Sequence, residues 1–240
     1  LEISVNAIKE IVLRYELPPA KVLLLDCDNT LWGGVAGEDG LGGLAIGQDG
    51  MGQVFLDFQI EIKKIAEKGT ILCLVSKNNE ADVWEVFDQH SEMILTREDI
   101  TAWKINWEEK GYNIRELAQD LNLSLDSFVF WDDNPLERDK ASNLVPEMNT
   151  VDIPKNIYEW PTYLRTLNDF SKPFLTDNDL HKVKQYGMRA NFVRDSNNLM
   201  NESQYLKSIN LKPTTNNIND SNISRAAQMC SKTNQFNLRT

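Results

Sequence analysis

Short apolar runs alternate with amphipathic stretches along the first two thirds of the chain. Continuous apolar runs at 22–25, 70–75 and 127–131 predict strands that are buried on both faces of a sheet. Residues 53–67 carry apolar side chains at helical spacing, and Gly69 follows as a helix stop. This alternation predicts an α/β fold with a doubly wound parallel sheet, because parallel strands need helical crossovers between them.

The remaining elements of this region are predicted from capping and turn residues. The glycine-rich stretch 33–52 is predicted to be a mobile loop with little regular structure. The other predictions are a helix at 80–88 capped by Asn78 or Asn79, a helix at 114–121 capped by Asn113, Pro135 in the first turn of a further helix, and short strands at 93–95 and 149–153.

The two ends of the chain read differently from the middle. Helical spacing at 3–17, before Pro18 and Pro19, predicts an N-terminal helix over 1–19. The core is expected over 20–170, followed by a helical C-terminal appendage over 171–240. Within that appendage helical patches are predicted at 177–194 and 222–232, with an Asn-rich and Ser-rich stretch between them.

Charge and composition narrow the classes of partner. The 240 residues carry a formal net charge of −11, which disfavours nucleic acid and anionic membranes as partners. No apolar run approaches the roughly 20 residues of a membrane span, and no signal peptide is recognised at the start. Three scattered cysteines, Cys27, Cys73 and Cys230, indicate neither a disulfide framework nor a zinc cluster. We therefore expect a cytoplasmic protein, and a first residue other than Met suits a domain excised from a longer chain.

A candidate reaction centre follows the first predicted strand at Asp26-Cys27-Asp28. Two carboxylates two residues apart at a strand end can address one Mg²⁺, which prefers oxygen ligands. A carboxylate can also attack a phosphoryl group, and its neighbour can move the proton. The alternative is a solvated acidic turn, which a bare Asp-x-Asp pattern would favour. The preceding strand and the following Asn29 and Thr30 favour the reaction centre.

Three further motifs follow in order along the chain. Ser76, Lys77 and Asn78 come after the second strand, where hydroxyl and N–H groups can hold phosphate oxygens. Lys110, with Lys104 as the alternative, can neutralise a phosphoryl group. Asp132 and Asp133 follow another strand, where a pair of carboxylates is costly without a cation. Taken singly, each motif has an ordinary explanation as a helix cap or a surface charge.

The order of these motifs resembles the four-motif pattern of the haloacid dehalogenase (HAD) superfamily over residues 20–155. The resemblance implies a HAD-like, Rossmannoid fold with a minimal cap and a Mg²⁺ cofactor. It implies that Asp26 accepts the phosphoryl group and that Asp28 is the general acid and base. Ser76, Lys77 and Lys110 would bind phosphate. Mg²⁺ would be held by Asp26, by Asp28 through its backbone carbonyl, and by Asp132 or Asp133.

A narrower resemblance, to the FkbH-like subfamily, runs across nearly the whole chain. It is carried by the stretches DNTLWGGVAGEDG at 28–40, SKNNE at 76–80, NW at 106–107, FVFWDDNPLER at 128–138 and KTNQFN at 232–237. Members of that subfamily take a glyceryl unit from 1,3-bisphosphoglycerate, release phosphate and load the acyl group onto an acyl carrier protein. The resemblance therefore implies a glyceryl transferase/phosphatase of polyketide biosynthesis, with neighbouring polyketide synthase domains if the chain is an excised part.

Two hypotheses about the reaction stay open at this stage. In the first, Cys27 accepts the acyl group as a thioester, since a thiolate attacks the carbonyl carbon of an acyl phosphate and keeps the group activated. In the second, the chain is a Mg²⁺-dependent phosphatase that works through a phosphorylated Asp26. Contacts to substrate are expected from Asn29, Thr30, Trp32, Asn78, Asn234 and Gln235. An acidic carrier protein would meet a basic patch drawn from Lys77, Arg97, Lys104 and Lys110, or else an apolar surface.

Overall fold

The computed structural model describes residues 19–170 and, further on, residues 183, 185–191, 193, 215, 217–219 and 223. The chain divides into two units, Leu1–Arg194 and Asp195–Thr240, and the strands and the acidic motifs belong to the first. The predicted helix at 3–17, Cys230, Asn234 and Gln235 lie outside the described residues. Residues 183, 185–191 and 193 are helical, within the predicted patch at 177–194. None of the helices in the described part of the chain is long and apolar enough to cross a membrane.

The centre of the first unit is a parallel sheet of five strands in the order β3-β2-β1-β4-β5. The central strand, β1, pairs with β2 and β4, so that Leu25 lies opposite Leu74 and Trp131. Chain order runs outward from β1 first in one direction and then in the other, which confirms the doubly wound α/β fold. The strands are β1 (Val22–Leu25), β2 (Ile71–Ser76), β3 (Ile100–Ile105), β4 (Phe128–Trp131) and β5 (Asn149–Thr150).

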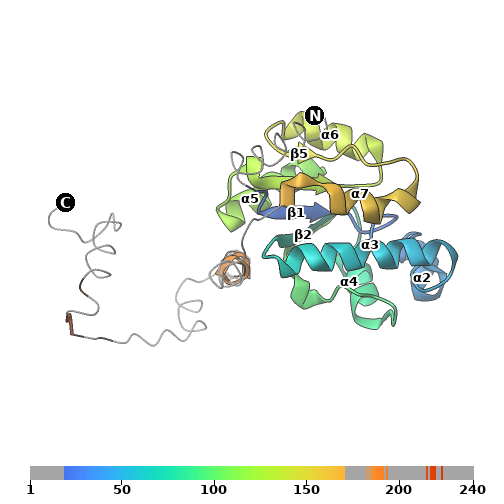
Figure 1. Cartoon of the computed structure of the whole chain (residues 1–240), viewed down its shortest axis with the longest axis horizontal. Helices are drawn as coiled ribbons and strands as arrows, with labels where there is room; N and C mark the ends of the chain where they lie inside the picture. The colour runs from blue at the N-terminus through green and yellow to red at the C-terminus, as the bar shows by residue number, and fades with distance from the viewer. Residues whose placement is uncertain are drawn as a thin grey trace, which may run out of the picture. The chain divides into compact units, whose positions relative to one another are not determined.

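Helices cover both faces of this sheet (Figure 1). Alternate residues of β1 face opposite sides: Leu23 and Leu25 pack in the cluster that includes Phe58 of α3, and Leu24 packs in the one that includes Ile114 of α5. The strands are therefore apolar throughout, as both faces are buried. The helices are α2 (Ala36–Gly43), α3 (Gly50–Glu67), α4 (Glu80–Gln89), α5 (Lys110–Leu121), α6 (Pro135–Leu144) and α7 (Trp160–Thr166), with 3-10 turns η1 (Arg97–Asp99), η2 (Leu125–Ser127), η3 (Ile157–Glu159) and η4 (Asn168–Phe170).

The glycine-rich segment after β1 is more ordered than its composition predicts. Residues 33–52 were expected to form a loop, but they contain α2 and the first residues of α3. A β-bridge joins Gly33 to Ala45, and Gly40, with φ of 61°, divides α2 at a kink. Helix α2 packs beside α4. No larger domain is inserted between β1 and α3, which agrees with the expected minimal cap.

One predicted strand is absent and one strand of the sheet was not predicted, each for an identifiable reason. Residues 93–95 form no strand, because Ile94 and Leu95 donate their backbone N–H groups to the buried side chain of Gln59 on α3. The strand lies instead at β3, which the apolar pattern missed. In the first part of β3, an outer strand of the sheet, the buried residues Ile100 and Ala102 alternate with the partly exposed Thr101 and Trp103.

The predicted helix caps were only partly right. Asn134 caps α6 by accepting the N–H of Leu136, and Pro135 begins that helix as expected. Asn113 does not cap α5, because the helix already begins at Lys110 and Asn113 lies buried within it. Asn79 precedes α4 but its side chain makes no capping bond.

Candidate active site

The motif residues after β1 and β4 meet at the carboxyl edge of the sheet. Since Leu25 lies opposite Trp131, the next residues along the two strands, Asp26 and Asp132, become neighbours. The backbone N–H of Asp26 donates to the carbonyl oxygen of Trp131 at 3.1 Å, which continues the pairing past the last strand residue. In parallel α/β sheets this edge is where ligands bind.

Three carboxylates and one lysine gather there, and we call them the aspartate–lysine cluster: Asp26, Lys110, Asp132 and Asp133. One carboxylate oxygen from each aspartate lies within 4.8 Å of the others. Lys110, the first residue of α5, places its Nζ 2.9 Å from Oδ2 of Asp26 and 2.5 Å from Oδ2 of Asp132. The lysine and Asp132 are almost fully buried, so their charges interact with little screening by water.

Burial sets the electrostatics of this cluster. It raises the pKa of Asp132, and the nearby Asp26 carboxylate raises it further. The same two causes raise the pKa of Asp133 to about 6. Burial by itself would lower the pKa of Lys110, but Asp26 and Asp132 outweigh it and raise that pKa. Three carboxylates and one ammonium leave a formal charge of −2 when all are ionised, which a divalent cation would neutralise.

The donor set fits Mg²⁺. Oδ1 of Asp26 is buried and has no hydrogen-bond partner, so this oxygen lacks the compensation that buried charge requires. The cluster offers hard carboxylate oxygens at one point, which is the chemistry that Mg²⁺ selects. Asp26, Asp132 and Asp133 are the residues that would hold it. The predicted contribution of the backbone carbonyl of Asp28 remains a prediction.

Asp28 has a different environment from Asp26. Its Oδ1 accepts hydrogen bonds from Nε1 of Trp32 at 2.9 Å and from the backbone N–H of Ala36 at 3.0 Å. Its Oδ2 accepts one from Nδ2 of Asn78 at 2.7 Å. Burial raises the pKa of Asp28, although the bonds from Ala36 and Trp32 act against that shift. We call Asp28 and its three donors the Asp28 clamp.

Two residues after the first strand hold the turn together. Asn29 has a left-handed backbone, with φ of 56°, and its side chain accepts the N–H of Gly34. Thr30 is fully buried; its hydroxyl lies 3.3 Å from Oδ1 of Asp133 and accepts the N–H of Asp133 at 3.2 Å. The side chains predicted to touch substrate, Asn29, Thr30, Trp32 and Asn78, thus all bond to the turn or to the acidic residues.

Cys27 lies between the two aspartates but in a separate environment. Its side chain is fully buried and belongs to the apolar core. Burial raises its pKa well above the ordinary value and Asp26 adds to this, while a hydrogen bond with Ser76 lowers it. A thiolate at Cys27 is therefore disfavoured in this conformation. The nucleophilic role of Cys27 remains a prediction.

The basic residues proposed for phosphate and partner binding already face acidic neighbours. Lys110 faces them within the aspartate–lysine cluster, and the other three face them outside it. Lys77 lies 3.2 Å from Glu109 and 3.1 Å from Glu137. The others are paired as follows: Arg97 with Asp88 at 2.6 Å, and Lys104 with Glu116 at 2.6 Å. These pairs do not favour docking of an acidic partner by charge.

Arg138 takes part in the site although sequence reasoning gave it no role. From α6 it donates to the backbone carbonyl oxygens of Asp132 and Asp133, at 2.7 and 2.9 Å. It fixes the turn that carries both carboxylates. Its position one helical turn after Asn134 was the available signal, because a long side chain there reaches back toward the N-terminus of the helix.

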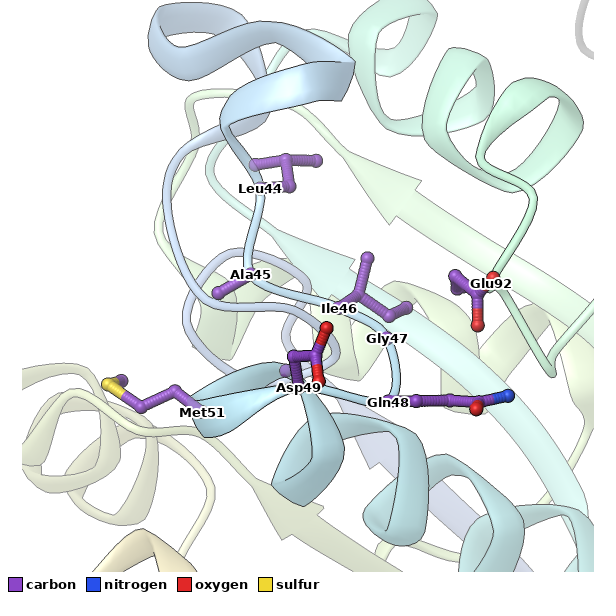
Figure 2. A pocket seen from close by; sticks show the side chains of 9 residues that line it. Leu44, Ala45, Ile46, Gly47, Gln48, Asp49, Met51 and Glu92 are labelled. Carbon is purple, nitrogen blue, oxygen red and sulfur yellow. The ribbon is translucent and has the colours of Figure 1, made fainter.

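A separate pocket of about 560 Å³ lies around the segment that connects α2 to α3 (Figure 2). Its lining includes Ile46, Gln48 and Met51 but no member of the aspartate–lysine cluster. Two carboxylates, Asp49 and Glu92, also line it, and they would repel a phosphorylated ligand. The pocket therefore does not compete with the cluster as a phosphate site.

Comparison with known proteins finds similarity to a solved structure. No family model matches the chain, and no curated protein matches it. The chain is similar to the crystal structure of the N-terminal part of the protein BF1531 from Bacteroides fragilis, which contains a phosphatase domain and is complexed with Mg. The identity is 40% and the TM-score is 0.66, over 70% of this chain and 45% of that one. The chain thus spans less than half the length of the structure it matches.

Proposed function

We propose that this chain, which has the HAD-like fold, is a Mg²⁺-dependent enzyme that releases phosphate from a small phosphorylated compound through Asp26. The observation that carries the proposal is the buried, unpartnered Oδ1 of Asp26 beside Asp132, Asp133 and Lys110. The phosphatase domain that the similar structure contains, and its Mg complex, add support. The order of the motifs supports the same chemistry.

Each residue of the site has its own role in the proposed reaction. A carboxylate oxygen of Asp26 attacks phosphorus, a new O–P bond forms, and the bond from phosphorus to the leaving oxygen breaks. Asp28 gives a proton to that oxygen, then takes one from the water that hydrolyses the phosphorylated Asp26. Lys110 holds its charge against the transferring group. Mg²⁺, when bound, would supply further stabilisation of the negative charge on the phosphoryl oxygens.

Acyl transfer to an acyl carrier protein is the second candidate function. It is favoured by the stretches that resemble the FkbH-like subfamily and by Cys27, which adjoins Asp26 in the chain. A glyceryl unit taken from 1,3-bisphosphoglycerate must lose both phosphates. Attack on the carbonyl carbon expels one phosphate, and hydrolysis of the ester at the other end removes the second. The two candidate reactions are therefore compatible in one enzyme.

Trapping of the covalent intermediate separates these reactions. The protein is incubated with Mg²⁺ and 1,3-bisphosphoglycerate, quenched in acid and measured as intact mass. We expect a phosphoryl adduct that Asp26→Asn abolishes. An acyl adduct that Cys27→Ala abolishes would support the first step of acyl transfer, acceptance of the acyl group by Cys27. No adduct and no Mg²⁺-dependent release of phosphate from this substrate or from simple phosphate esters would overturn the proposed function.

A further inference from the structure

The Asp28 clamp leaves one hydrogen-bonding position of the carboxylate open. A carboxylate offers about two lone-pair positions on each oxygen. The two positions on Oδ1 are taken by Trp32 and the backbone of Ala36, and one on Oδ2 is taken by Asn78. The remaining position is on Oδ2. A proton that Asp28 exchanges with a substrate is therefore carried there, since each of the other three positions is already occupied by a donor.

The donors of the clamp are held firmly in place. The side chain of Trp32 is fully buried, and its ring meets Phe87 edge-on at a centroid distance of 6.1 Å. Asn78 is 4% exposed, and its own Oδ1 accepts the backbone N–H of Asn79 at 2.7 Å. That second bond fixes which end of the amide faces Asp28. Neither side chain is free to swing toward a substrate while these bonds are made.

We propose that Trp32 and Asn78 are positioning residues that hold Asp28 so that the open position of Oδ2 meets the leaving-group oxygen. This inference rests on the proposed function, in which Asp28 moves the proton. It replaces the sequence-based expectation that Trp32 and Asn78 contact substrate directly. A donor that orients an acid contributes to the chemical step and not to the binding of substrate, because substrate never touches it.

The test uses two phosphate esters that differ in their need for a proton. Glycerol phosphate has a poor leaving group that needs protonation, whereas p-nitrophenyl phosphate has a good one that needs little. Trp32→Phe keeps an aromatic ring and removes the N–H donor. We expect it to lower kcat for glycerol phosphate by about tenfold, a modest part of the 10²- to 10⁴-fold typical of proton transfer. The kcat for p-nitrophenyl phosphate and both KM values should stay within about twofold on the same argument.

Trp84→Phe is the matched control. Trp84 also packs edge-on against Phe87, at 5.2 Å, and also donates its N–H to a carboxylate, but that acceptor is Glu80 and not Asp28. We expect it to leave the ratio of the two kcat values unchanged. Asn78→Ala, which removes the donor to Oδ2, should shift the ratio in the same direction as Trp32→Phe and serves if Trp32→Phe does not fold.

Equal losses on both esters, a change confined to KM, or the same shift in Trp84→Phe would overturn the positioning role. The proposed function fails separately, and only if the unaltered protein releases no phosphate from either ester in the presence of Mg²⁺. A selective loss on glycerol phosphate alone supports both ideas. The unaltered protein thus tests the function, and the ratio between esters tests the clamp.

Discussion

The two carboxylates of the Asp26-Cys27-Asp28 motif are compensated in different ways, although only one residue separates them. Asp26 faces a buried ammonium, two further carboxylates and, at Oδ1, no partner. Asp28 faces three neutral N–H donors and no ion pair. The aspartate–lysine cluster is thus short of positive charge, whereas the Asp28 clamp is satisfied by dipoles. The cluster is therefore suited to binding a cation, and the clamp is suited to orienting the carboxylate of Asp28.

Asp26→Asn should give the largest effect, because it removes the attacking oxygen and a metal ligand together. We expect the rate of phosphate release to fall by about 10⁴-fold or more, as for other groups that act covalently. An assay of phosphate release in the presence of Mg²⁺ measures this rate. Asp57→Asn, an exposed aspartate of α3 that pairs with Gln53, is the control and should change little. Retention of most activity in Asp26→Asn would remove Asp26 from the mechanism.

Lys110→Met tests the charge balance of the cluster. Removal of one partner from a buried ion pair typically costs about 3–5 kcal/mol, since the carboxylates keep their burial without their counter-charge. We expect a loss of this size in denaturant unfolding with EDTA, and a smaller loss with Mg²⁺, which can take over part of the neutralisation.

Lys104→Met is the matched control for that measurement. Lys104 pairs with Glu116, whose side chain is 53% exposed. A surface pair contributes about 0–1 kcal/mol. Equal destabilisation in the two variants, or no effect of Mg²⁺ on Lys110→Met, would contradict the charge deficit of the cluster.

The sequence predicted the cluster better than the clamp. Asp26, Asp132 and Lys110 could be found because each follows or approaches a strand end, and parallel topology brings strand ends together. The clamp depends on α2, whose glycine-rich sequence reads as a loop, and on which way Asn78 turns. Neither the first N–H of α2 nor the rotamer of a side chain leaves a signal in the sequence. Strand β3 was missed for a related reason, since its alternation mixes Lys104 and Trp103 with apolar residues.

The dependence of stability on pH should distinguish the cluster with Mg²⁺ from the cluster without it. Burial raises the folded-state pKa of Asp133 to about 6 from its ordinary 3.8. A group whose pKa is raised on folding stabilises the folded state at pH values below its unfolded-state pKa. That stabilisation is lost as the pH rises through its folded-state pKa. Without Mg²⁺ the protein should therefore lose stability between about pH 4 and pH 6 at this residue.

Mg²⁺ should offset that loss, because it stabilises the ionised carboxylates. At about 100 times its Kd, a ligand adds about 2.7 kcal/mol, which raises Tm by about 5–10 °C in a chain of this size. We expect the difference in Tm between Mg²⁺ and EDTA to be larger at pH 8 than at pH 5. Asp133→Asn should reduce that pH dependence. If Mg²⁺ raised Tm equally at both pH values, no group of the cluster would change its protonation when the metal binds.

Cys27→Ala should give the smallest effect on phosphate release and the clearest separation of the two candidate reactions. The thiol is fully buried in the core, so its removal should cost about 0.5–3 kcal/mol of stability, the range of ordinary core changes. Cys73→Ala is the control, because Cys73 is equally buried on β2 and burial raises its pKa to about 12.

If Asp26 is the nucleophile, both variants should release phosphate from p-nitrophenyl phosphate at rates within about twofold of the unaltered protein, since neither removes a group that meets the reacting atoms. Transfer to a carrier protein gives the second readout. A loss of transfer in Cys27→Ala, with phosphate release and the Cys73→Ala control intact, would mean that the thiol leaves its buried position to react. A loss of phosphate release in Cys27→Ala alone would instead place the thiol in the phosphoryl chemistry and contradict the division of roles between Asp26 and Asp28.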